Sequence, residues 1–209
     1  MGFANNTCSF TRFRILDSAP ETLWSEIPDR LRKFAFHDID NIPEMQSCGW
    51  VNFEDMLDST WNETPPDKAT CFVFSLRLDR RRIPPGVVKK HLALALREEK
   101  ERLRIQDKTF ISRERKKEIR EQVQLRLRRH FLPVPGEFNV LWLTERNEVW
   151  FASTRSNMID MFLEEFLKTF ELHLEQVTPY TLAASMLNEE GALCLDQLDA
   201  TNFAPRSTV

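Results

Sequence analysis

The stretch from residue 84 to residue 131 is long, highly charged and almost free of the alternating pattern of a β-strand. Apolar residues recur at helical spacing in both of its halves: Val88, Leu92, Leu96 and Leu103 in the first, and Ile119, Val123 and Leu127 in the second. One narrow apolar stripe is typical of a helix that packs against a single partner. We therefore predict a helical hairpin with a turn near residues 108–112, a candidate N-cap at Ser112, and an end at the Pro-Val-Pro of residues 133–135.

The same region concentrates positive charge. Residues 77–130 contain 19 Lys and Arg against 8 Asp and Glu, whereas the remaining 155 residues contain 10 against 24. The formal net charge of −3 thus combines a segment of +11 with a remainder of −14. Counterion release depends on where cations cluster, so the acidic average does not exclude a nucleic acid as partner.

Many of these cations fall on one side of each predicted helix. Rows of this kind suit the phosphates of a nucleic acid backbone, which are bound without reading base edges. The candidate DNA-binding residues are Arg80, Arg81, Arg82, Lys89, Lys90, Arg97, Lys100, Arg104, Lys108, Arg113, Lys116, Lys117, Arg120, Arg128 and Arg129. The hairpin contains only two aromatic residues, Phe110 and Phe131, so base stacking is not the expected mode.

Two other interpretations of the hairpin remain open. It could be a solvated structure whose charge is partly balanced by neighbouring glutamates, or it could dock on an acidic protein surface, including that of a second copy. Phe110 at the predicted turn is either a local cap of the two helices, which we favour, or an anchor for a contact.

The rest of the chain mixes strands and helices. We expect strands over residues 8–16, 49–51, 71–79, 138–144 and 148–152, and helices over residues 20–36 and 158–170. In the third strand, the apolar side chains at Phe72, Phe74, Leu76 and Leu78 should face the core, with Ser75, Arg77 and Asp79 on the solvent side.

This order predicts an α+β fold, with a mixed or antiparallel sheet, packed helices and a projecting basic helical hairpin. We expect a discontinuous central domain of residues 1–83 and 132–182, the hairpin over residues 84–131, and an acidic C-terminal tail over residues 183–209.

Evidence for an enzyme is weak. Glu171, His173 and Glu175 alternate along a predicted strand and could bind a divalent ion, although any solvent-facing strand shows the same pattern. A Pro-Asp…Glu-x-Lys nuclease set can be composed from Pro66, Asp67, Glu98 and Lys100, but this Glu-x-Lys falls on a predicted helix rather than on a strand. We expect no catalytic residue and no cofactor, with a metal-dependent nuclease as the less favoured alternative.

The sequence contains no apolar run of the roughly 18 to 20 residues that cross a bilayer, and its start lacks the regions of a signal peptide. Its four cysteines form no C-x-x-C pair. These features predict a cytoplasmic protein with reduced thiols and no membrane partner.

Four segments follow one another in the order CGWV, RIPPGVVKKHLALALREEKERLR, RERKKEI and NVLWLTERNEVWFAST. With the helix after them, they resemble the RdgC family of bacterial recombination-associated DNA-binding proteins over most of residues 8–182. The resemblance implies a ring-shaped homodimer that takes duplex DNA through a positively charged hole without reading its sequence and that restrains recombinase filaments.

The resemblance also matches Lys89, Lys108 and Lys116 to cations of the family's hairpin. It implies a nucleoid location and contact with recombination proteins. The family carries an exonuclease label, for which we find no carboxylate set in this sequence. Because the chain has no counterpart of the family's C-terminal portion, we expect a short form and leave ring closure open.

Overall fold

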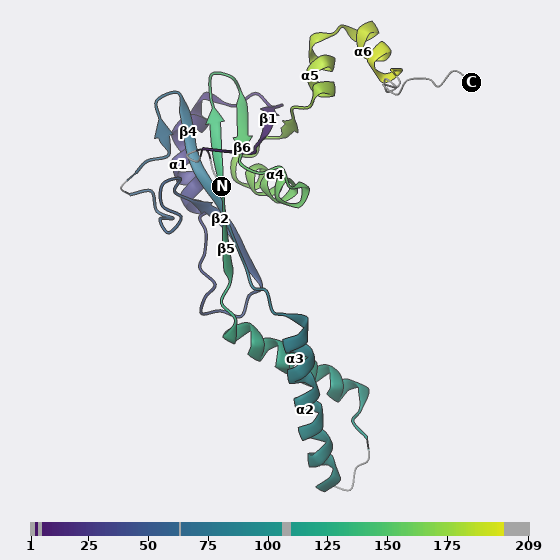
Figure 1. Cartoon of the computed structure of the whole chain (residues 1–209). Coiled ribbons are helices and arrows are strands. Elements are labelled where there is room, and N and C mark those ends of the chain that lie inside the picture. Colours follow the sequence, from purple (N-terminus) through teal and green to yellow (C-terminus); the bar gives the residue numbers. More distant parts are fainter. Residues whose placement is uncertain (1–2, 4–5, 63, 106–109, 199–209) are drawn as a thin grey trace, which may run out of the picture.

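The computed structural model describes residues 3, 6–62, 64–105 and 110–198 (Figure 1). These residues form seven strands and six helices, so the predicted α+β class is confirmed. The strands are β1 (Thr11–Ile15), β2 (Gln46–Val51), β3 (Asp67–Lys68), β4 (Cys71–Arg80), β5 (Val134–Leu143), β6 (Glu148–Phe151) and β7 (Leu174–Gln176). The helices are α1 (Glu21–Lys33), α2 (Pro85–Ile105), α3 (Arg113–His130), α4 (Ser156–Phe170), α5 (Pro179–Met186) and α6 (Glu189–Asp196).

The strands form one antiparallel sheet in the order β2-β4-β5-β6-β1-β7, with β3 paired to β4 beside this path. Strands β4 and β5 pair over ten residues each, from Cys71 opposite Leu143 to Arg80 opposite Val134. The chain between these two strands forms α2 and α3. The helical hairpin is therefore inserted at the far end of the β4–β5 ribbon and projects away from the sheet (Figure 1).

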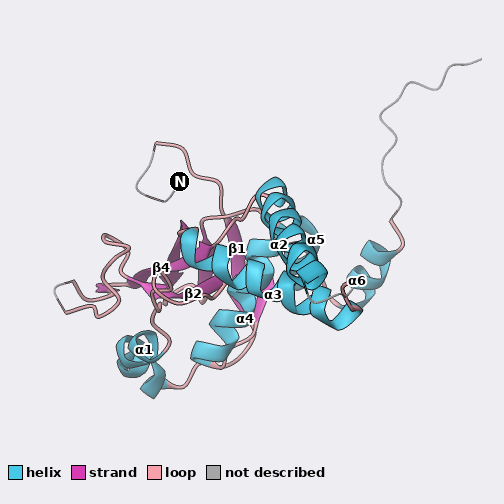
Figure 2. Ribbon diagram, turned by 90° about the horizontal axis from the view of Figure 1, so that it is seen from below, coloured by secondary structure: helices cyan, strands magenta, loops and turns pink. Residues whose placement is uncertain are grey.

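Helices α1 and α4 contact each other and lie on the same side of the sheet (Figure 2). They cover the face to which Phe74 of β4 and Trp142 of β5 point, and all these elements share one apolar core. The core is rich in aromatic rings, and its largest fully buried side chains include Trp50, Trp142, Phe74, Phe162, Phe166 and Phe170. The indole N–H of Trp50 donates to Thr169 Oγ1 at 2.7 Å, whereas the buried indole N–H groups of Trp61 and Trp142 have no acceptor among the described residues.

The opposite face of β4 differs from the prediction. Ser75, Arg77 and Asp79 are buried, with exposed fractions of 0%, 8% and 2%, rather than solvent-facing. Residues that precede β4 cover Arg77, whose guanidinium lies 4.1 Å from the Phe36 ring centroid and donates to the Met56 carbonyl at 3.2 Å. The Ser75 hydroxyl donates to Glu137 of β5 and accepts from Asn139 of the same strand. Strand β4 is therefore buried on both faces. Its apolar side chains face the aromatic core, and its polar side chains are buried on the opposite face.

Gly49 is fixed by the close approach of two backbone segments. Strand β2 forms a parallel bridge with the residues after α1, in which the Phe36 N–H donates to the Trp50 carbonyl at 2.9 Å. A Cβ atom at position 49 would lie 2.6 Å from the backbone N and Cα of Phe36. Only glycine fits here without moving the chain, which explains the Gly in the CGWV segment.

The C-terminal region contains helices that the sequence did not predict. Helix α5 starts at a capping box, in which the hydroxyl of Thr178 accepts from the N–H of Thr181 at 3.1 Å. The predicted boundary between residues 182 and 183 falls inside this helix, and α6 follows within the predicted acidic tail. Both helices lie on the side of the sheet remote from the hairpin (Figure 1).

Candidate nucleic-acid interface

Helices α2 and α3 pack against each other through a small core of their own. Ile119, Val123 and Leu127 of α3 are buried against Val88 and Leu96 of α2, which are partly buried. The Ser112 hydroxyl caps α3 by accepting from the Arg115 N–H at 3.1 Å. The predicted cap is thus confirmed, and so are the predicted apolar stripes except at Leu103, which is not among the residues of this core. The hairpin is held together independently of the aromatic core.

An ion pair links the two helices across this core. The guanidinium of Arg115 donates to both carboxylate oxygens of Glu99, at 2.8 and 3.3 Å, and to Glu118 at 2.9 Å. The Glu99 side chain is only 13% exposed. Its hydrogen bonds from Arg115 lower the pKa of Glu99 below the usual range, and the same contacts raise the pKa of Arg115.

This pair makes the stability of the hairpin depend on pH. A carboxylate with a depressed pKa contributes stability above its unfolded pKa of about 4.3, and this stability is lost as pH falls through the lower folded pKa. We expect the thermal midpoint of the wild-type protein to fall more steeply below pH 4.5 than that of Glu99→Gln, and amide exchange in α2 and α3 to increase. Equal slopes for the two proteins would contradict this role. Glu101→Gln, on the exposed side of α2, serves as the matched control.

The hairpin has two different faces. Two grooves run between the helices, and residues Glu98 and Arg126 line both of them, which places these two side chains on one face. Successive residues of a helix are turned by about 100°, so Lys89 and Lys100 lie about half a turn from Glu98. On α3, Lys117 lies a similar angle from Arg126. Most of the predicted DNA-binding cations of the two helices thus lie on the face opposite the grooves, whereas Arg102, Arg115 and Arg126 line the grooves.

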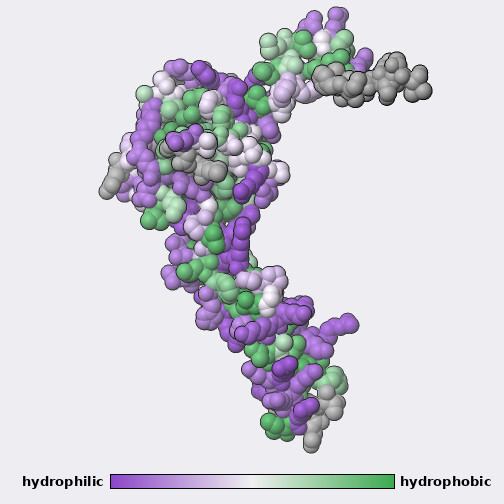
Figure 3. All heavy atoms as spheres, viewed as in Figure 1, coloured by the Kyte–Doolittle hydropathy of each residue, from purple (hydrophilic) through white to green (hydrophobic). Residues whose placement is uncertain are grey.

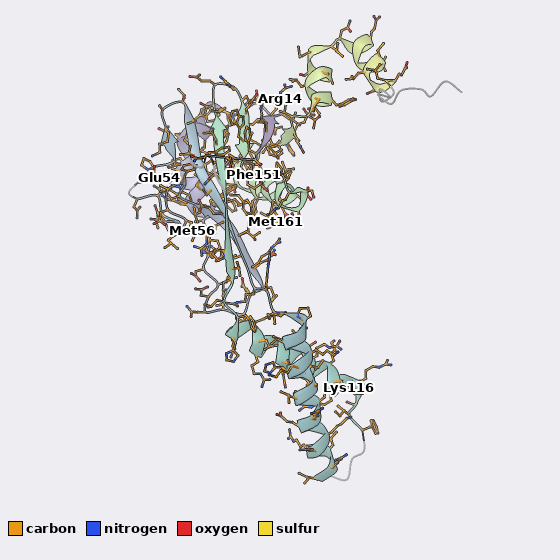
Figure 4. The ribbon with its side chains drawn as sticks, in the orientation of Figure 1. Arg14, Glu54, Met56, Lys116, Phe151 and Met161 are labelled. Atoms are coloured by element: carbon orange, nitrogen blue, oxygen red, sulfur yellow. The ribbon has the colours of Figure 1, made fainter. Side chains whose placement is uncertain are left out.

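We call this surface the cationic face. It comprises Lys89, Arg97, Lys100 and Arg104 of α2, and Arg113, Lys116, Lys117, Arg120 and Arg128 of α3. All of these side chains are exposed except that of Arg128, which is half-buried. Within the described part of the chain, the one ion pair that involves them joins Lys117 to Glu121 at 4.0 Å. Figure 4 labels Lys116 on the hairpin, and Figure 3 shows hydrophilic residues alternating with hydrophobic ones over the visible side of this element.

The other predicted cations are distributed elsewhere. Lys90 lies on the outer side of α2 at the edge of the cationic face, about 20° around the helix from Arg97, and Arg129 shares the groove side with Arg126. Arg80 and Arg82 line a separate hollow at the root of the hairpin. Lys108 lies outside the described residues.

Arg81 does not fit the predicted role. Its side chain is buried, with 4% exposed, and its guanidinium donates to the backbone carbonyls of Ile39, Asp40, Ile42 and Glu44. These four acceptors hold the loop after α1 against the end of β4. A guanidinium engaged in this way is not accessible to a phosphate, so Arg81 is a structural residue.

The predicted cap at Phe110 is wrong. Phe110 is 77% exposed, and its neighbour Ile111, at 6%, is the buried residue at this end of the hairpin. Ile105 at the end of α2 is 87% exposed. The tip of the hairpin therefore presents two apolar side chains to solvent.

The predicted arrangement of Glu171, His173 and Glu175 along one strand is also wrong. Glu171 ends α4 in the left-handed conformation, and β7 begins only at Leu174. Glu171 pairs with Arg30 at 3.4 Å, and His173 Nδ1 lies 3.0 Å from Asp17. Among the residues that the structure describes, no group of three His, Cys, Asp or Glu side chains could hold a metal ion. Of the nuclease set, Glu98 and Lys100 lie on α2, as expected.

Arg155 is a residue that the sequence reasoning missed. It occupies the N-cap position of α4 and lines the hollow that also contains Arg80 and Arg82. A sequence signal was present, because a basic residue at a helix start with no acid in the first turn is unfavourable for the helix dipole.

No known family model matches the chain, and a comparison with curated proteins gave no match. Within the described ranges, no helix is both long enough and apolar enough to cross a membrane.

Proposed function

We propose that this protein binds double-stranded DNA without sequence specificity, through contacts of the cationic face with backbone phosphates. The observation that carries this proposal is the gathering of nine cations from two helices on one face, almost all without a carboxylate partner among the described residues. Exposed guanidinium and ammonium groups release condensed counterions when they meet phosphates, and they require no base-edge geometry.

The dimensions of the hairpin suit this partner. Helix α2 has 21 residues and extends about 32 Å at ~1.5 Å per residue. Along one DNA strand this length corresponds to about nine phosphates at ~3.4 Å each. A contact to four to eight phosphates is therefore within reach of the face. Assembly as a homodimer, a nucleoid location and a role in recombination or replication are further parts of the proposal that rest on the sequence resemblance to RdgC.

The test is duplex binding by the purified chain over a salt series, with two duplexes of equal length and unrelated sequence. We expect equal affinities for both, and a linear fall of log affinity with log salt whose slope is about −4 to −7, since each phosphate contributes ~0.9. A slope near zero, or a large preference for one duplex, would contradict the proposal. Single strands of the same length measure the preference for duplex.

A second candidate function is that of a protein-interaction module. The observation that favours it is the apolar tip of the hairpin, with Ile105 at 87% and Phe110 at 77% exposure. Single exposed apolar side chains are common on protein surfaces, but an aromatic residue at the end of a projecting element is a candidate contact anchor, because binding energy concentrates in a few such residues. This function needs no free cationic face, so it can be tested separately from DNA binding.

We expect Phe110→Ser to weaken self-association, or binding to a recombination protein, by about tenfold, because truncating an aromatic anchor at a docked interface costs more than ~1 kcal/mol. Sedimentation velocity over a concentration series measures this, with Leu132→Ser as the control, since Leu132 is 70% exposed at the opposite end of the hairpin. Identical sedimentation of Phe110→Ser and the control would exclude the tip as the anchor.

A further inference from the structure

A hollow of about 240 Å³ lies at the root of the hairpin, where the end of the β4–β5 ribbon passes the N-terminus of α4. Arg80, Arg82 and Gly136 line it from the ribbon, and Arg155 and Asn157 line it from the helix. It opens on the side of the ribbon that also carries α4. The hollow is thus built from elements far apart in the sequence and is distinct from the cationic face.

Three arginines line this small hollow, and an anion bound among like charges reduces their mutual repulsion. Among the described residues, none of these three guanidinium groups forms an ion pair within 4.0 Å. The Nη2 atom of Arg80 donates to the sulfur of Met161 at 3.2 Å, a weak acceptor, and its Nε atom is buried without any hydrogen-bond partner. A buried guanidinium N–H without an acceptor is rare in folded proteins. The neighbouring Arg81 has the same feature at its Nε atom, but its other nitrogens donate to backbone carbonyls, whereas the guanidinium of Arg80 has only the sulfur of Met161 among the described residues.

The start of α4 adds to the positive potential of the hollow. Arg155 stands at the N-cap position, where its side chain forms no capping hydrogen bond, and the first turn of the helix contains no acidic residue. The N–H groups at the start of a helix lack the acceptor four residues earlier, and this end carries partial positive charge. In α4 the Met158 N–H donates to the Arg155 carbonyl at 3.0 Å, which leaves the N–H groups of Ser156 and Asn157 for an anion. A cation in place of the usual Ser, Thr or Asp cap is unfavourable for the isolated helix. An anion that accepts from both Arg155 and the first-turn N–H groups removes this conflict.

We propose that this hollow is a binding site for a phosphate group. Guanidinium groups form paired, charge-assisted hydrogen bonds with phosphate oxygens, and helix N-termini bind the same group. The volume of about 240 Å³ is below the ~300 Å³ at which sites for larger ligands begin, so it takes a single phosphate rather than a whole nucleotide. The phosphate is either part of a DNA backbone that continues from the cationic face or a free ion. Only the first source rests on the proposed function.

The test uses the full chain with two pairs of substitutions. Arg82→Gln with Arg155→Gln removes two cations of the hollow, and both residues are exposed, so the fold should tolerate the change. Lys33→Gln with Arg146→Gln removes the same charge from exposed positions outside the hollow and serves as the control. Thermal midpoints are measured with increasing inorganic phosphate, against chloride at the same ionic strength. Duplex affinity is measured over the salt series.

We expect phosphate to raise the midpoint of the wild type and the control in a saturable way, and to have no more effect than chloride on the hollow variant. For duplex binding, the hollow variant should show a roughly tenfold loss at low salt and a slope smaller by about one, which identifies a backbone phosphate as the source. If the hollow variant loses the response to phosphate but binds duplex as tightly as the wild type does, the ligand of the hollow is the free ion instead.

The inference is overturned if phosphate acts like chloride on the wild type and if the hollow variant binds duplex as the control does. Failure of the proposed function has a different signature. In that case no protein binds duplex at any salt concentration, and the response of the wild type to inorganic phosphate alone decides whether the hollow is a phosphate site.

Discussion

Reversing four charges of the cationic face is expected to abolish duplex binding, with a loss of at least about a hundredfold at low salt. The four substitutions are Lys100→Glu, Arg104→Glu, Lys116→Glu and Arg120→Glu. Each pair of positions is four residues apart on its helix, so the side chains form two adjacent rows on one face. Replacement by glutamate removes four phosphate contacts and adds four repulsive charges. The slope of log affinity against log salt should shrink by about 3 to 4.

These four side chains are exposed, and none forms an ion pair among the residues described, so the variant should keep its fold. The control has the same change of net charge on the sheet domain: Lys33→Glu, Lys68→Glu, Arg146→Glu and Lys168→Glu. It also breaks the ion pairs Lys68–Glu54 and Lys168–Glu165, so it is the more demanding of the two variants for the fold. Fluorescence anisotropy with a labelled duplex gives the affinities, and circular dichroism verifies the helices. Binding by the hairpin variant within threefold of the control would place the DNA contact elsewhere.

The hairpin could be predicted because its determinants are local. Apolar residues every four positions, a serine cap and the Pro-Val-Pro end are all visible in consecutive residues, and these define α2 and α3 closely. The cationic face follows from the same periodicity. The tip could not be predicted, since nothing local distinguishes Phe110 from Ile111 as the residue that packs under the turn.

The sequence patterns did not predict the features that depend on contacts between segments far apart in the chain. The polar face of β4 is buried because the segment around Phe36 and Met56 folds over it, and no pattern within the strand indicates such a cover. Arg80, Arg81 and Arg82 look equivalent in sequence but point to alternate sides, so that only Arg81 meets the loop carbonyls. The hollow was missed for the same reason, because it exists only where the ribbon meets α4.

The largest expected effect on stability is that of Asp79→Ala. Both oxygens of Asp79 accept from the guanidinium of Arg77, at 2.9 and 2.8 Å, and the two side chains are only 3% and 10% exposed. These hydrogen bonds raise the pKa of Arg77, so its charge persists at every pH at which the protein is folded. Truncating Asp79 leaves a buried, unpaired cation, which costs about 3 to 5 kcal/mol in the free energy of unfolding.

The double variant Arg77→Met with Asp79→Ala is expected to recover more than half of this loss, because it removes the unpaired charge and leaves an apolar side chain beside Phe36. Urea denaturation of the three proteins measures the free energies. Equal losses in the single and double variants would show that lost contacts, and not the buried charge, cause the destabilisation.

The single substitution Asp79→Ala also tests whether the hairpin acts as an independent unit. The core of the hairpin, formed by Ile119, Val123 and Leu127 against α2, contains no residue of the sheet. Asp79 lies one residue from the end of β4, on the side of the ribbon covered by the loop after α1. At temperatures where Asp79→Ala is still folded, its duplex affinity should therefore stay within about threefold of the wild type. A parallel loss of stability and affinity would mean that the ribbon sets the orientation of the cationic face, and that DNA binding depends on the sheet as well as on the two helices.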